Sequence, residues 1–98
     1  MKINISTEND TTTVALDGRL DTMTAPELEA ELRQRIDGVD HLVFDFAKLE
    51  YLSSAGLRVL LASQKTMNKQ GTMQILNAND TIREIFDVTG FSDILTID

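Results

Sequence analysis

Apolar and polar residues alternate at the start of the chain. The alternation covers residues 2–7, and residues 11–16 are rich in β-branched side chains. Both patterns are typical of strands with one buried face. The polar residues 8–10 between them favour a turn, so we expect the two segments to pair as an antiparallel hairpin.

A first helix is predicted after Thr24, where apolar residues recur at helical spacing. Thr24 and Glu27 stand in the positions of a capping box, and Pro26 falls in the first turn, where its missing N–H costs little. Gly38 provides a stop. The predicted buried stripe consists of Ala25, Leu28, Leu32 and Ile36.

Two further helices are predicted, one over residues 54–70 and one that begins after Asn79 or Asp80. Gly71 and Gly90 mark their ends. The apolar residues expected to face the core are Leu57, Leu60, Leu61 and Met67 in the first of these helices, and Ile82, Ile85 and Phe86 in the second.

Between and after the helices, three apolar runs predict strands at residues 41–47, 73–77 and 94–97. The run at 41–47 is apolar enough to be buried on both faces, which is typical of parallel strands under helices. The resulting order is ββαβαβαβ, an α/β fold with a mixed β-sheet and helices packed on it. We expect a single domain over residues 1–98.

The composition limits the kinds of functional site that the chain can contain. With 42% apolar and 26% charged residues, the chain has the composition of an ordinary globular domain. It contains no cysteine and one histidine, which excludes disulfides, thiolate metal sites and sites with several histidines. No metal and no cofactor is therefore predicted.

The formal net charge of −7 argues against nucleic acid as a partner. Between residues 51 and 79 the only charged residues are the bases Arg58, Lys65 and Lys69. They fall along one side of the predicted helix. This side is either a solvated surface or a face toward an acidic or phosphate-bearing partner.

The start of the chain does not resemble a signal peptide, and no apolar run approaches the roughly 20 residues that cross a bilayer. We therefore expect no membrane insertion and a cytoplasmic location.

A catalytic set is not evident. His41 precedes an apolar strand without a nearby nucleophile, so it is expected to lie at a strand edge. Asp45 interrupts the strand at 41–47 and is expected to accept hydrogen bonds from nearby backbone N–H groups. The glycine-rich phosphate loops of nucleotide enzymes are absent. We predict that the protein is not an enzyme.

The adjacent hydroxyls of Ser53 and Ser54 stand where the helix at 54–70 is predicted to begin. A serine there can cap the helix. It can also carry a phosphate, because a helix N-terminus favours negative charge and free amides are expected at residues 55–57. The residues alone leave both roles open.

The segment YLSSAGLRVLL at residues 51–61, preceded by VFDF at 43–46, resembles the signature of STAS domains. It is most similar to that of the stand-alone bacterial anti-sigma factor antagonists. Residues 18–25 and 82–91 resemble two further segments of the family. The resemblance runs through nearly the whole chain without an insertion.

This resemblance implies a partner switch. An unphosphorylated antagonist binds an anti-sigma factor that is also a serine kinase of the histidine-kinase-like ATPase type. The kinase phosphorylates one serine and the complex separates, and a PP2C-type phosphatase reverses the reaction.

Aligning Gly56 with the family's glycine implies that Ser54 is the phosphoacceptor, with Ser53 as the second candidate. Ser53 stands where the family often has aspartate, and Ala55 where it often has a second hydroxyl. The predicted partner-binding residues are Asp21, Ser53, Ser54, Ala55, Gly56 and Arg58.

Two alternatives stay open. The chain can be a STAS interaction module of a transport or signalling complex that works without phosphorylation. It can also be a nucleotide-binding STAS domain, for which the bases that follow Ser54 leave room.

Overall fold

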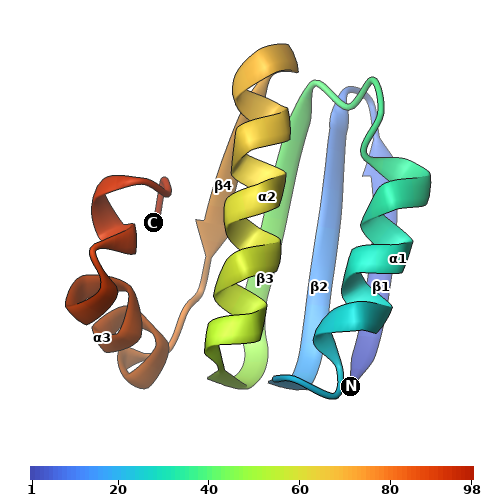
Figure 1. Ribbon diagram of the computed structural model, residues 1–98. Coiled ribbons are helices and arrows are strands. Elements are labelled where there is room, and N and C mark those ends of the chain that lie inside the picture. Colours follow the sequence, from blue (N-terminus) through green and yellow to red (C-terminus); the bar gives the residue numbers. More distant parts are fainter.

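The computed structural model describes residues 1–98 and contains one sheet with helices on it (Figure 1). The strands are β1 (Lys2–Glu8), β2 (Thr11–Leu20), β3 (His41–Leu52) and β4 (Thr72–Leu76). The helices are α1 (Ala25–Arg35), α2 (Ser54–Gln70) and α3 (Asp80–Thr89), followed by the 3₁₀ turn η1 (Phe91–Asp93). The observed order ββαβαβα confirms the predicted α/β fold up to its last strand.

The sheet has the strand order β1-β2-β3-β4. β1 and β2 form the expected antiparallel hairpin, whereas β2–β3 and β3–β4 pair in parallel. α1 and α2 lie side by side on one face of the sheet, and α3 stands beyond β4 (Figure 1). The connections after β2 and β3 each carry a helix, as parallel neighbours require.

The predicted strand at residues 94–97 is wrong in extent. A single bridge joins Ile97 to Ile75 of β4, supported by hydrogen bonds from Ile75 N to Thr96 O and from Asp98 N to Ile75 O. The reason lies just before it. The N–H of Leu95 donates to Phe91 O, so this stretch of backbone is still helical where a strand would need it extended.

β3 is longer than the predicted strand at 41–47. It runs to Leu52 because its pairing with β2 continues to Leu20 across two register shifts. These irregularities break the alternation of the sequence, which is why the pattern ended early. The extension brings the end of β3 directly to the serines.

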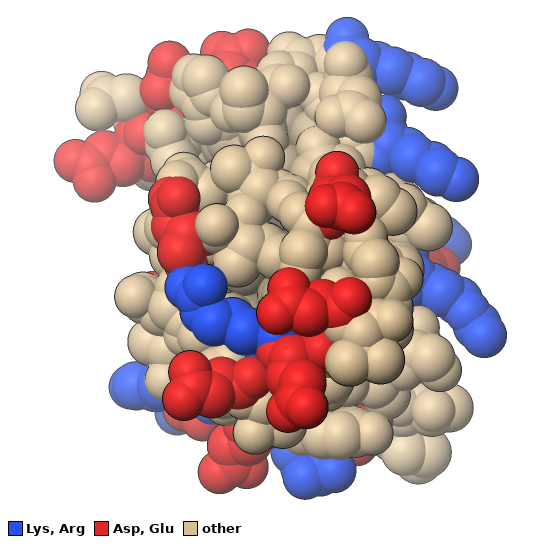
Figure 2. Space-filling model, turned by 90° about the vertical axis from the view of Figure 1, so that its left-hand side faces the viewer, with Lys and Arg blue, Asp and Glu red and all other residues tan.

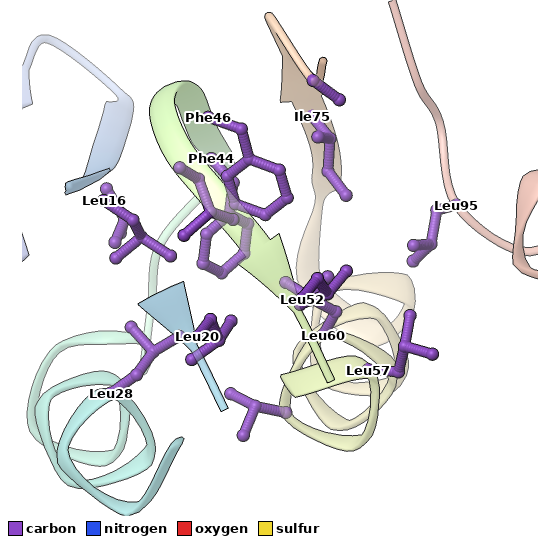
Figure 3. Packing of buried hydrophobic residues seen from close by; sticks show 14 of the residues in the cluster. Leu16, Leu20, Leu28, Phe44, Phe46, Leu52, Leu57, Leu60, Ile75 and Leu95 are labelled. Atoms are coloured by element: carbon purple, nitrogen blue, oxygen red, sulfur yellow. The ribbon is translucent and has the colours of Figure 1, made fainter. Parts of the chain in front are cut away.

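The core fills the space between the sheet and the helices (Figure 3). The large side chains Phe44 and Phe46 of β3 lie at its centre with ring centroids 6.1 Å apart. The predicted helix faces are confirmed with some adjustments. Ile36, Leu61 and Ile85 are only half-buried, and Val59, which was not predicted, is buried.

The end of α2 opposite the serines is held to the α1–β3 connection. The Gln70 side-chain amide donates to Ile36 O at 2.7 Å and to Val39 O at 2.9 Å. Gly71 lies so close to Asp40 that an added Cβ would stand 1.8 Å from the Asp40 carbonyl oxygen. This end of the helix therefore has little freedom to shift.

The predicted capping box of α1 is wrong. Thr24 occupies the N-cap position but makes no side-chain cap bond. Its Oγ1 instead accepts from the Asp21 N–H at 2.9 Å and donates to Arg19 O at 2.8 Å, and the Glu27 N–H donates to the backbone oxygen of Thr24. Two other local predictions are confirmed. Asp45 accepts from the Ala47 N–H at 3.0 Å, and His41 lies at a strand edge, with its Nδ1 2.7 Å from Thr72 Oγ1.

Candidate functional site at the start of α2

Ser53 is the N-cap of α2. Its backbone is extended, and its Oγ accepts a hydrogen bond from the Gly56 N–H at 3.5 Å. The Ser53 N–H donates to Leu20 O at 2.9 Å, which ties this cap to the end of β2. The capping role is thus taken by the half-buried Ser53.

Ser54 is the first residue of α2, and its side chain is exposed. Because Ser53 provides the cap bond, the Ser54 hydroxyl is left outside the cap. The first turn of α2 contains no acidic residue. An exposed hydroxyl at the N-terminus of a helix whose first turn contains no acidic residue is chemically able to accept and hold a phosphate.

Fewer free amides surround Ser54 than the sequence suggested. The Leu57 N–H donates to Ser53 O at 3.0 Å, inside the helix ladder, and the Gly56 N–H is used by the Ser53 cap. Of the three amides expected to be free, that of Ala55 remains. The helix N-terminus still favours an anion there, but through fewer donors.

Gly56 is buried against two leucines of the neighbouring strands. An added Cβ would lie 2.6 Å from Leu52 Cδ1 and 2.8 Å from Leu20 Cγ, closer than real contacts. The absence of a side chain at this position lets the first turn of α2 pack directly on the ends of β2 and β3. Gly56 therefore sets the position of the serines and is itself buried.

Arg58 is exposed one turn after Ser54, and Lys65 and Lys69 are exposed farther along α2. Figure 2 looks onto the α3 side of the molecule: acidic side chains spread over the face toward the viewer, whereas basic ones line its right-hand edge, on the side of α2. The surface that continues from the serines along α2 is thus basic, although the chain as a whole is acidic.

Asp21 lies in the loop between β2 and α1. Its Oδ1 accepts from the Met23 N–H at 3.0 Å and from the Thr24 N–H at 3.2 Å. The Asp21 N–H donates in turn to Thr24 Oγ1 at 2.9 Å. These bonds close the loop on itself, and the link from Ser53 to Leu20 holds it beside the start of α2.

The same contacts set the charge of Asp21. Partial desolvation pushes the pKa of its carboxyl upward, but the hydrogen bonds from Thr24 and Met23 work against this. Together with the nearby Arg19 guanidinium, they hold the pKa of Asp21 below its ordinary value of 3.8. The loop therefore presents a fixed negative charge close to the serines.

Three residues near the start of α2 were not predicted from the sequence: Arg19, Met23 and Tyr51. The Arg19 guanidinium carbon lies 4.4 Å from the centroid of the Tyr51 ring, and its Nε is 4.0 Å from Asp21 Oδ2. Met23 projects from the loop with 86% of its surface exposed. The sequence does contain one sign of an exposed apolar residue here: Met23 stands between two threonines, in the segment before the first predicted helix.

The structure thus brings together Asp21, Ser53, Ser54, Ala55 and Arg58 around the start of α2, with Gly56 beneath them. No three histidine, aspartate or glutamate side chains gather where they could hold a metal ion. None of the helices is both long and apolar enough to cross a membrane.

Known proteins resemble the chain along its full length. A Bordetella bronchiseptica protein named anti-sigma factor antagonist BtrV is 33% identical over 99 residues, which cover 99% of this chain and 85% of that protein. The anti-sigma-B factor antagonist of Staphylococcus epidermidis is 32% identical over 101 residues, covering 99% of this chain and 94% of the relative.

Among solved structures, the Bacillus anti-sigma factor antagonist SpoIIAA shares the fold in two states. Its unphosphorylated form has a TM-score of 0.78 at 19% identity, covering 99% of this chain and 87% of that one. Its phosphorylated form has a TM-score of 0.77 at 20% identity, covering 99% and 91%. The sequence model of the STAS domain family matches residues 2–98, and the chain belongs to this family.

Proposed function

We propose that this protein is an anti-sigma factor antagonist whose binding to its partner is controlled by phosphorylation of Ser54. One observation carries the assignment to this serine: Ser54 is exposed at the first position of α2, while its neighbour Ser53 provides the cap. The names of the two curated relatives, both antagonists, support the class of function.

In its unphosphorylated state, the protein binds an anti-sigma factor serine kinase of the histidine-kinase-like ATPase type, which frees a sigma factor. The contact surface consists of Asp21, Ser53, Ser54, Ala55 and Arg58, with Gly56 setting the position of the serines. The Asp21 carboxylate and the exposed guanidinium of Arg58 add charged groups to a surface that carries the neutral hydroxyl of Ser54. Such a pattern fixes the register of a docked partner.

Phosphorylation adds about −1.5 to −2 charges at the Ser54 hydroxyl. The N-terminus of α2 and the Ala55 amide accommodate that charge, so the domain keeps its fold. The partner surface was matched to a neutral group, so it meets an uncompensated charge and the complex separates. SpoIIAA has this fold in both phosphorylation states, which supports a switch without refolding. A PP2C-type phosphatase restores the hydroxyl.

The proposal is tested by mixing the purified protein with ATP and, one at a time, the purified histidine-kinase-like ATPases of its source organism. Mass spectrometry of the digested product then maps the phosphate. We expect one phosphate, on Ser54, that a purified PP2C phosphatase removes. Ser53→Ala serves as the matched control, because it keeps Ser54 and removes only the neighbouring hydroxyl.

Two results would contradict the proposal. Phosphate found on Ser53 alone would show that the cap residue is the acceptor. The absence of any label with every kinase, while the kinases phosphorylate another protein, would remove the switch altogether.

A further inference from the structure

Four large apolar side chains are exposed on this molecule. Met23 and Tyr51 are 86% and 36% exposed, and Val88 and Ile94 are 80% and 49% exposed. Single exposed apolar residues are common on protein surfaces and mean little by themselves. The first pair differs from the second in what surrounds it.

Met23 sits on a loop whose backbone is held in place. The Asp21 carboxylate accepts the N–H of Met23 itself, and the Thr24 hydroxyl donates to Arg19 O at 2.8 Å. The backbone beneath Met23 is therefore fixed before any partner arrives, while its side chain remains exposed. A side chain presented in this way loses less conformational entropy on binding than one on a loose loop.

Tyr51 and Arg19 extend the same surface. The Arg19 guanidinium stacks on the Tyr51 ring at 4.4 Å and reaches toward Asp21 at 4.0 Å. Methionine, tyrosine and arginine are the residue types enriched in the centres of protein interfaces. Arg19 and Tyr51 pair near the ends of β2 and β3, and Met23 lies in the loop that follows β2. We call these three residues the loop patch, and the bond from the Ser53 N–H to Leu20 O ties this end of β2 to the start of α2.

Val88 and Ile94 have a different setting. The acids Glu84, Asp87 and Asp93 are exposed on the same segments, and Figure 2 shows acidic side chains spread over that face. Charged residues are depleted from interface centres, where each would lose its hydration. This face does not favour a buried contact.

We propose that Met23 is an apolar anchor of the partner interface: it inserts into an apolar pocket on the anti-sigma factor, flanked by Tyr51 and Arg19. This inference rests on the proposed function and adds to it the direction in which the partner interface extends from Ser54. The interface extends from Ser54 toward the loop patch and leaves the α3 face free. Met23 makes the largest contact and contributes to the choice of partner.

Calorimetric titration of the kinase with the unphosphorylated protein and its variants tests the anchor. We expect Met23→Glu to weaken binding roughly 30-fold or more and Met23→Ala about 10-fold, the loss typical of an interface hot spot. Val88→Glu is the matched control, since it introduces the same charge at a similarly exposed apolar position. Its affinity should stay within about twofold of the wild type, a change of only ~0.4 kcal/mol.

Methyl NMR gives a second measurement in which Met23 itself is not substituted. With ¹³C-methyl-labelled methionine, the Met23 signal should shift or broaden when the kinase is added. The signals of Met67 and Met73, which are buried in the core, should not change. Ser54→Glu should suppress the change at Met23.

The failures are distinguishable. If Ser54→Glu weakens binding but Met23→Glu does not, and the Met23 methyl signal stays unchanged, the anchor is wrong and the proposed function stands. If Val88→Glu weakens binding as much as Met23→Glu, the direction of the interface is wrong. If the wild-type protein binds none of the kinases, both proposals fail.

Discussion

The starts of α2 and α3 are built alike but differ in one respect. In each, a residue in extended conformation caps the helix by accepting the N–H three residues on: Ser53 from Gly56 at 3.5 Å, and Asn79 from Ile82 at 2.9 Å. The next residue is Ser54 in α2 and Asp80 in α3. α3 thus has a permanent negative charge where α2 has a neutral hydroxyl.

This difference indicates what each terminus is for. A carboxylate at the first position of a helix stabilises it, and α3 has this arrangement as a fixed feature. α2 gives up that stabilisation and keeps an uncharged group that can be modified. On the proposed function, phosphorylation puts negative charge at Ser54, the position at which α3 has the acidic residue Asp80.

The third position of each helix differs as well. α3 buries Ile82 there, whereas α2 has Gly56 packed against Leu20 and Leu52. α3 is thus anchored by a side chain in the core. α2 is anchored by the close approach of its backbone to two strands, which holds the serines at a fixed place on the surface.

The strongest test of the comparison exchanges the two first positions. Ser54→Glu should lower the affinity for the kinase roughly 30-fold or more, because a charge enters an interface matched to a hydroxyl. Asp80→Ser makes the reverse change at α3 and should leave that affinity unchanged. Titration calorimetry measures both, and an equal effect of the two would refute the distinction.

Gly56→Val should lower the free energy of unfolding by about 2–3 kcal/mol, because the added side chain overlaps Leu20 and Leu52. Ala62→Val, at an exposed position of the same helix, controls for the cost of a β-branched residue and should change stability by only a few tenths of a kcal/mol. Urea unfolding followed by circular dichroism gives both values. Equal stability of the two variants would mean that the first turn can move away from the strands.

The two caps should differ in strength. Asn79→Ala should cost about 1–2 kcal/mol of stability, since Asn79 makes a short cap bond and its amide also donates to Leu49 O at 3.1 Å. Ser53→Ala should cost only about 0.5 kcal/mol because its cap bond is long. A larger loss for Ser53→Ala in urea unfolding would show that the α2 cap is tighter than its geometry indicates.

The smallest effect concerns Asp21 and pH. Its pKa is lowered in the folded state, so its carboxylate stabilises the fold above the ordinary value of 3.8, and this contribution is lost as pH falls through the folded pKa. Asp21→Asn keeps an acceptor oxygen but removes the charge. The stability difference between wild type and variant should be constant at neutral pH and shrink below about pH 4. A difference that does not depend on pH would contradict the assignment.

Regular patterns allowed most of the fold to be predicted from the sequence. Both ends of the helix over residues 54–70 could be predicted because serines stand at its start, Gly71 follows it, and apolar residues recur at helical spacing between them. The parallel strands followed from apolar runs separated by helices. The last predicted strand was wrong in extent because the Leu95 N–H bonds back to Phe91 O, which keeps the chain after η1 in a turn. The alternation of residues does not reveal this bond.

The site was predictable only in part. The motif identified the two serines, and the structure separates their positions into a cap and an exposed first residue. The predicted Thr24 capping box failed because Thr24 Oγ1 accepts from the Asp21 N–H, while the Glu27 N–H donates to the backbone oxygen of Thr24. The loop patch was missed because its residues come from two strands and a loop. Arg19 meets Tyr51 only through the register of β2 and β3.

Gln70 binds two carbonyls at the far end of α2, about 25 Å from Ser54 along a helix of 17 residues. That anchoring divides the protein into a scaffold and an exchangeable tip. On the proposed function, residues 19–24 and 51–58 are the two segments to graft together between relatives to redirect partner choice, with the framework left as it is. A transplant that leaves out either segment would then carry over only part of the proposed contact surface.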